Sequence, residues 1–130
     1  MLLDTSTIVE LLAKPATDPL VRRILDAVGD APLFASPIHI GEVADAARRS
    51  GIDPAAAARK AMEIVELIPL DASLAIGASS LKAEARARPT GRDFSLIDGV
   101  GLATARSRGL PMLTLDREFL GLPDATVLAP

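Results

Sequence analysis

The sequence predicts an α/β fold with a mostly parallel sheet. Three observations indicate it: short apolar runs alternate with helical patterns along the whole chain, two of these runs lead into an aspartate, and helices repeatedly begin at Ser-Pro or Asp-Pro pairs. Such alternation is typical of parallel sheets that helices cover. A chain of 130 residues with 49% hydrophobic content can bury a sizeable core. We therefore expect residues 1–130 to form a single domain.

The first strand is expected at Leu2 and Leu3, because residues that are apolar on both faces are typical of the middle of a parallel sheet. Asp4 stands where this strand ends, and a short helix follows over residues 7–12 until Pro15 ends it. Ligands of open α/β sheets bind at the carboxyl ends of the strands, so Asp4 is well placed for chemistry. The alternative is that Asp4 only caps the helix behind it.

The remaining elements follow in the same alternation. Asp18-Pro19 begins a helix that runs to Val28 and completes a helical hairpin on the outside of the sheet. Further strands are expected at 32–35, 67–70, 110–115 and 125–128, and further helices at 38–50, 55–66, 74–87 and 95–108. Pro69 places the 67–70 strand at a sheet edge. Gly99 and Gly101 indicate tight packing against the last helix, since each costs about 1 kcal/mol relative to alanine there.

Four acidic residues stand at junctions between elements and are called the four acids below. Asp4 and Asp116 end strands, whereas Glu42 and Asp98 lie early in helices that follow loops. Right-handed crossovers bring all these junctions to one edge of the sheet, so we expect the four acids to converge. Simpler alternatives exist: Ser95 and Asp98 have the spacing of a capping box, and Glu42 could face solvent.

Converging carboxylates require a cation, because two of them ~4 Å apart repel by about 4 kcal/mol at an effective dielectric constant near 20. Oxygen ligands alone favour Mg²⁺ or Mn²⁺ over zinc or copper. The sequence has no cysteine and one histidine, His39. Thiolate zinc sites, thiol nucleophiles and a two-histidine acid–base pair are therefore excluded. We expect His39 to be a packed or surface imidazole.

The composition also limits which binding partners and which cellular location we expect for the protein. A net charge of −3 and a pI near 5.1 argue against broad coating of nucleic acid. They are compatible with an enzyme that meets nucleic acid at a metal-filled acidic site. No signal peptide fits before Asp4 and no apolar run is long enough to span a membrane, so we expect a cytoplasmic protein.

Two classes of phosphoacceptor protein also carry acids at strand ends. A dehalogenase-like protein is disfavoured because Ser6 stands where that class has a second aspartate. A receiver-like protein is disfavoured because the sequence has no lysine at a late strand end.

Four short segments, taken in order, resemble the motifs of PIN-domain nucleases: Asp4-Thr5-Ser6, Gly41-Glu42-Val43, Ser95-Leu96-Ile97-Asp98 and Thr114-Leu115-Asp116-Arg117-Glu118-Phe119. The resemblance covers essentially the whole chain and is nearest to the VapC-like toxins of toxin–antitoxin pairs. It implies a three-layer α/β/α sandwich with strand order 3-2-1-4-5. This sequence departs from the family in the glycines after Asp98. It also lacks tyrosine and tryptophan, which leaves little aromatic surface for stacking bases.

The resemblance further implies that the four acids form the metal-binding, catalytic pocket of a ribonuclease that prefers single-stranded RNA and uses Mg²⁺ or Mn²⁺. Ser6 and Thr114 match positions where the family keeps a small polar residue that steadies these acids. Our candidates for contacts with the RNA backbone precede Asp98 in the chain and are Arg86, Arg88 and Arg92. Their alternative role is that of a solvated helix end.

The partners that the resemblance implies are a second copy of the chain and a small antitoxin. The resemblance also implies that the helical hairpin of residues 5–28 captures the antitoxin. The apolar stripe of Leu20, Ile24 and Val28 in this hairpin could be an exposed face or part of the core, and the sequence alone does not separate the two. Two alternatives to a toxin remain open. One is a PIN nuclease that matures ribosomal RNA, and the other is a PIN scaffold that binds without catalysis.

Overall fold

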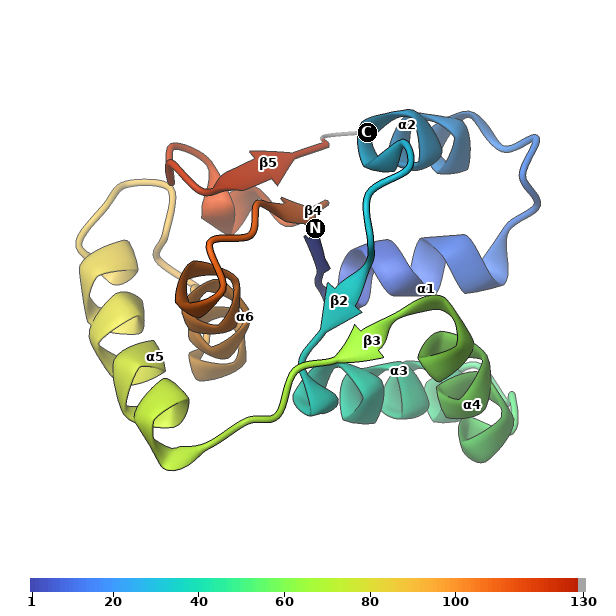
Figure 1. Cartoon of the computed structure of the whole chain (residues 1–130), viewed down its shortest axis with the longest axis horizontal. Coiled ribbons are helices and arrows are strands. Elements are labelled where there is room, and N and C mark those ends of the chain that lie inside the picture. Colours follow the sequence, from blue (N-terminus) through green and yellow to red (C-terminus); the bar gives the residue numbers. More distant parts are fainter. Residues whose placement is uncertain (129–130) are drawn as a thin grey trace.

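A computed structural model describes residues 1–128 and contains a five-stranded sheet between two layers of helices (Figure 1). The strands are β1 (Leu2–Leu3), β2 (Phe34–Ala35), β3 (Glu66–Leu67), β4 (Met112–Thr114) and β5 (Ala125–Val127). Their order is β3-β2-β1-β4-β5, and the four pairings between them are parallel. The predicted three-layer sandwich, its strand order and the edge position of the third strand are confirmed.

The helices are α1 (Thr5–Ala13), α2 (Pro19–Val28), α3 (Pro37–Arg49), α4 (Pro54–Ile64), α5 (Ala72–Arg86) and α6 (Leu96–Ser107), with a 3-10 helix, η1 (Arg117–Phe119). Their starts agree with the predicted caps, as at Asp18, whose Oδ1 accepts from the amides of Leu20 and Val21. Helix α5 begins earlier than expected because Asp71 caps it, accepting from Leu74 N at 2.8 Å. No helix within residues 1–128 has the length and apolarity needed to cross a bilayer.

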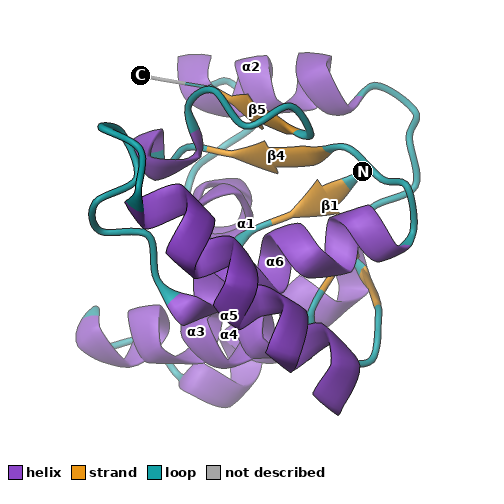
Figure 2. Cartoon of the chain, turned by 90° about the vertical axis from the view of Figure 1, so that its left-hand side faces the viewer, coloured by secondary structure: helices purple, strands orange, loops and turns teal. Residues whose placement is uncertain are grey.

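The core has two halves because successive side chains of a strand point to opposite faces of the sheet. Leu3 packs with Ile8 and Ile24 in the half that α1, α2, α3 and α4 cover. Leu2 packs with Phe94 and Leu102 in the other half, under α5 and α6. Figure 2 looks onto α5 and α6, with β1, β4 and β5 behind them. Helices therefore cover both faces of the sheet and leave the ends of its strands as the place for a functional site.

The apolar stripe of α2 belongs to this core, an alternative that the sequence alone left open. Ile24 has no exposed surface, and Leu20 and Val28 are partly buried against the same cluster. The amphipathic pattern of a helix is the same whether its apolar stripe packs internally or binds another chain. Ile24 is therefore core and is not available to a partner, whereas capture of an antitoxin by the rest of the hairpin of residues 5–28 stays a prediction.

Two glycines let α6 approach its neighbours closely, as predicted. A Cβ atom on Gly99 would lie 2.4 Å from the carbonyl oxygen of Ala78 in α5. A Cβ atom on Gly101 would lie 3.0 Å from Cε of Met112 in β4 and 3.1 Å from Nε2 of His39. The first turn of α6, which carries Asp98, is thus held tightly against α5, α3 and the sheet.

Candidate functional site

The four acids line one cavity of about 400 Å³ at the carboxyl edge of the sheet. Asp4 follows β1 directly and Asp116 follows β4, which is the neighbour of β1. Glu42 comes from α3 and Asp98 from the first turn of α6. The other lining residues are Thr5, Ser6, Val9, Glu10, His39, Ala46, Arg49, Ile97, Met112 and Leu115. The structure therefore brings together the four side chains that the sequence predicted to converge.

Asp4 both caps α1 and lines this cavity, so the two alternatives for it hold at once. Its Oδ1 accepts from Thr7 N at 3.2 Å, from the Thr7 hydroxyl at 3.1 Å and from the Ser6 hydroxyl at 2.7 Å. Its Oδ2 accepts from the Thr114 hydroxyl at 2.5 Å. Burial raises the pKa of Asp4, which is 7% exposed, and these hydrogen bonds oppose that rise.

Ser6 and Thr114 connect the ends of the two central strands. The Thr114 hydroxyl donates to Asp4 and accepts from the amide of Asp116 at 3.0 Å. The Ser6 hydroxyl donates to Asp4 and accepts from the amide of Leu115 at 3.1 Å. Each hydroxyl thus uses one donor and one acceptor to hold the end of β1 against the end of β4.

Asp98 forms the capping box that the sequence indicated. Its Oδ2 accepts from Ser95 N at 2.8 Å, and its own amide donates to the Ser95 hydroxyl at 3.0 Å. Burial raises the pKa of Asp98 to about 6, and the negative charges of Asp116 and Asp4 also act to raise it, whereas the bonds to Ser95 oppose the shift. Asp98 therefore caps its helix, and its pKa also responds to the charges of Asp116 and Asp4, which line the same cavity.

Helix α3 presents one face to the cavity. His39, Glu42, Ala46 and Arg49 all line it, and their spacing of three or four residues places them along one side of a helix. Oε1 of Glu42 accepts a hydrogen bond of 2.5 Å from the hydroxyl of Thr5 in α1. Glu42 is thus half-buried and held toward α1, and it does not point freely into solvent.

His39 is a packed imidazole, as expected. It is 2% exposed, and its Nδ1 accepts from the amide of Ser36 at 3.2 Å. Burial lowers the pKa of His39 to about 4, so the ring is neutral at pH 7. A neutral ring that closes the start of α3 is a structural cap and offers no positive charge to the cavity.

The donor set suits a hard divalent cation, because the four acids supply only carboxylate oxygens. Burial is the main cause of the raised pKa of Asp98, and the charges of Asp116 and Asp4 add to it. Within residues 1–128, however, no three acid or histidine side chains stand in an arrangement that could already hold a metal ion. Both carboxylate oxygens of Asp4 accept hydrogen bonds from neighbouring hydroxyls instead. The chemistry of the residues therefore fits Mg²⁺ or Mn²⁺, whereas the ligand geometry is not preformed.

The three arginines predicted to contact RNA lie outside the cavity lining. Nε of Arg86 donates to the carbonyl of Phe94 at 2.8 Å. Nη2 of Arg88 donates to the Thr90 hydroxyl and to the carbonyl of Leu120. These two side chains therefore help to hold the loop before α6 in place, and contact of the three arginines with RNA stays a prediction. Arg92 is exposed.

Two charged residues of the cavity were missed at the level of sequence. Glu10 lines it and also pairs with Lys14 at 2.7 Å, and Arg49 lines it at the end of α3. The available signal was helical spacing: Glu10 lies four residues after Ser6, and Arg49 lies seven after Glu42. Residues at these spacings share a helix face.

The structure is thus a parallel α/β/α sandwich in which strand ends and flanking helices gather carboxylates in one cavity, at the edge where such folds bind ligands. The family model described as "PIN domain" matches residues 1–124, and the chain therefore belongs to the PIN domain family.

Solved structures agree with this fold. A toxin–antitoxin complex from Klebsiella pneumoniae is 22% identical with a TM-score of 0.72, covering 97% of this chain and 95% of that one. DNA-bound VapBC from Salmonella typhimurium is 25% identical with a TM-score of 0.69, covering 98% and 95%. VapC20 of Mycobacterium tuberculosis, a sarcin-ricin loop cleaving toxin, is 19% identical with a TM-score of 0.61, covering 98% and 88%. Comparison with functionally curated proteins gives no significant match.

Proposed function

We propose that this protein is an endoribonuclease that uses Mg²⁺ or Mn²⁺ to hydrolyse phosphodiester bonds of single-stranded RNA. The observation that carries the proposal is the convergence of the four acids on one cavity, where Asp116 and Asp4 add to the raised pKa of Asp98. Membership of the PIN domain family supports it, as does the likeness to a toxin that cleaves the sarcin-ricin loop.

The cavity contains acids that would bind the metal and hydroxyl residues that fix the position of one of those acids. Asp4, Glu42, Asp98 and Asp116 would bind the metal, which when bound orients and acidifies a water and neutralises charge that develops on the phosphate. Ser6 and Thr114 fix the two oxygens of Asp4. The chain has no cysteine, and its one histidine is a buried neutral cap. Attack by water is therefore the reaction that these side chains favour.

The test is cleavage of a labelled single-stranded RNA by purified protein in Mg²⁺, in Mn²⁺ and in EDTA. We expect cleavage with either metal, none in EDTA and loss of activity in Asp116→Asn. Asparagine keeps the oxygen that accepts from Glu118 N at 2.9 Å, so the cap of η1 survives in this variant. Duplex RNA and single-stranded DNA of the same sequence serve as controls for substrate class. Cleavage that resists both EDTA and Asp116→Asn would refute the proposal.

We propose in addition that the protein is the toxin of a toxin–antitoxin pair and acts in the cytoplasm. Structures of toxin–antitoxin complexes share its fold over nearly the whole chain, which favours this role over maturation of ribosomal RNA or binding without catalysis. Expression of the wild type should arrest growth, and expression of Asp116→Asn should not. An equal effect of both proteins on growth would contradict the role of a toxin.

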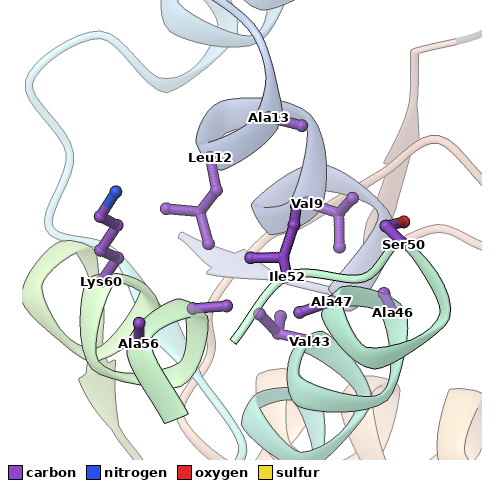
Figure 3. A pocket seen from close by; sticks show the side chains of 11 residues that line it. Val9, Leu12, Ala13, Val43, Ala46, Ala47, Ser50, Ile52, Ala56 and Lys60 are labelled. Carbon is purple, nitrogen blue, oxygen red and sulfur yellow. The ribbon is translucent and has the colours of Figure 1, made fainter. Parts of the chain in front are cut away.

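An apolar cavity of about 230 Å³ between α1, α3 and α4 is the surface that we propose for the antitoxin (Figure 3). Its walls include Leu12, Val43 and Ile52, and Ile52 is 57% exposed. Val9 and Ala46 line both this cavity and the acidic one. An apolar antitoxin segment seated here would therefore place its adjoining residues beside the four acids, where basic side chains would be attracted.

A pair of exposed isoleucines tests this surface. Ile52→Asp should weaken co-purification with the proposed antitoxin by tenfold or more, because burying an isoleucine contributes about 1.5–3 kcal/mol. Ile76→Asp is the matched control, since Ile76 is 71% exposed and lies on α5, away from the cavity. Equal effects of the two substitutions would contradict docking at this cavity.

The remaining expectations are proposals of the same kind. We propose that residues 1–130 form one nuclease domain, that the protein is a homodimer, and that exposed Arg92 contacts RNA. Sedimentation at micromolar concentration measures the association, and a strictly monomeric species would contradict the dimer. Residues 129 and 130 lie outside the described part of the chain.

A further inference from the structure

Arg49 is the one lysine or arginine that lines the acidic cavity within residues 1–128. It is the last residue of α3, it is exposed, and it lies on the same face of that helix as Glu42. Its neighbour Arg48 is also exposed and also belongs to the last turn, but it does not line the cavity. Favourable interaction with the helix dipole applies to both arginines and does not explain why one of them faces the acids.

The guanidinium of Arg49 has no hydrogen bond or ion pair in the described part of the chain. This is notable because five carboxylates line the same cavity, those of Glu10 and the four acids. Glu10 pairs with Lys14 at 2.7 Å, and Glu42 accepts from Thr5. A guanidinium offers five donors in a planar fork that matches the oxygens of a phosphate. Arg49 therefore has its full donor capacity available for an anion outside the protein.

We propose that Arg49 binds a backbone phosphate of the RNA next to the one that is cleaved. The inference rests on the ribonuclease function proposed above and adds a substrate contact to it. A polyanion that enters a cavity with five carboxylates is repelled wherever no cation compensates, and a metal held by the four acids would compensate charge at the reacting phosphate. The adjoining phosphate needs its own positive partner, and Arg49 supplies it from the end of α3. Arg86 and Arg88 do not line this cavity, and one nitrogen of each donates to a backbone carbonyl elsewhere.

The experiment compares Arg49→Ala with Arg49→Lys and with Arg48→Ala as the matched control. Steady-state cleavage of a short single-stranded RNA in Mg²⁺ should show KM raised about tenfold in Arg49→Ala with kcat changed much less. Arg49→Lys should recover part of the loss, and Arg48→Ala should resemble wild type. Binding of the same RNA to each variant in the Asp116→Asn background, measured against KCl concentration, should lose about 0.7 of log–log slope for the one phosphate contact that Arg49→Ala removes.

The results separate the inference from the function on which it rests. Wild type that shows no metal-dependent cleavage refutes the ribonuclease function and this inference with it. Wild type that cleaves, while Arg49→Ala and Arg48→Ala share one KM and one salt slope, overturns only the role of Arg49. Melting temperatures check folding: Arg49 is exposed and makes no polar contact within residues 1–128, so Arg49→Ala should melt with the wild type.

Discussion

The hydroxyl of Thr114 donates a hydrogen bond of 2.5 Å to Oδ2 of Asp4, and the two residues lie 110 positions apart in the chain. The same hydroxyl accepts from the amide of Asp116 at 3.0 Å. One side chain thus links the ends of β1 and β4, each of which leads into one of the four acids. The position of the Asp4 carboxylate therefore depends on a residue from the far end of the chain.

Thr114→Val tests this link because valine keeps the shape of threonine and removes the hydroxyl. The free energy of unfolding should fall by about 1.5–3 kcal/mol, the range for hydrogen bonds to charged groups. Metal-dependent cleavage should fall at least tenfold, since Asp4 loses the partner of its Oδ2. Urea titration and initial cleavage rates measure the two effects. Thr114→Ser retains the hydroxyl and should stay near wild type; a valine variant as stable and active as the serine variant would show that the bond is dispensable.

Gly99→Ala should destabilise the protein because the new Cβ would meet a backbone atom. It would lie 2.4 Å from the carbonyl oxygen of Ala78, so α5 and α6 would have to separate, at a cost of about 1–3 kcal/mol. Gly77→Ala is the control, since no atom lies within 4 Å of its Cβ position in α5. There alanine should stabilise by up to about 1 kcal/mol through helix propensity. Equal unfolding midpoints for the two variants would contradict the close contact of α5 and α6.

Mn²⁺ should raise the melting temperature of the wild type because the cation relieves repulsion among the four acids. At a hundred times the dissociation constant the stabilisation is about 2.7 kcal/mol, and each kcal/mol corresponds to roughly 2–8 °C for domains of this order of size. Asp116→Asn removes one of the charges that raise the pKa of Asp98. This variant should melt higher than wild type without metal and respond less to metal. No metal shift in the wild type, together with a less stable variant, would mean that these acids do not form a shared site.

The pH dependence of stability should reflect two opposing groups. Since the pKa of His39 is lowered to about 4, the unfolded chain takes up its proton first, and stability falls as the pH drops from about 6.5 toward 4. Since the pKa of Asp98 is raised to about 6, the folded chain takes up that proton first, and stability rises as the pH drops below about 6. The raised pKa of Asp4 acts in the same direction as that of Asp98.

Substitutions distinguish the contributions of His39 and Asp98 to the pH dependence of stability. His39→Gln can still accept from Ser36 N, as glutamine does in a capping box, and should gain stability relative to wild type between pH 6.5 and 5. Asp98→Asn should lose stability relative to wild type over pH 6 to 5. Urea midpoints of metal-free protein at pH 7, 6 and 5 measure both differences. Parallel pH curves for all three proteins would contradict the assigned pKa directions.

The sequence by itself determined the alternation of strands and helices, most helix starts and the gathering of the four acids at one edge of the sheet. Leu2 and Leu3 mark a buried strand by their own hydrophobicity, and Asp18-Pro19 marks a helix start by its local backbone chemistry. The acids were predictable because the parallel arrangement brings every strand end to one edge. The strand order came from the resemblance of four short motifs and not from periodicity.

Only the tertiary structure decided how particular side chains are used. Asp4 proved to cap a helix and to line the cavity, because Thr114 reaches it across 110 residues of chain. Ile24 proved to be core, and Arg88 proved to hold the Leu120 carbonyl, although both read locally as candidates for binding a partner. Arg49 shares a cavity with acids from other segments of the chain. Patterns in sequence report propensity and periodicity, whereas these contacts depend on which surfaces meet after folding, and that is set by the packing of elements far apart in the chain.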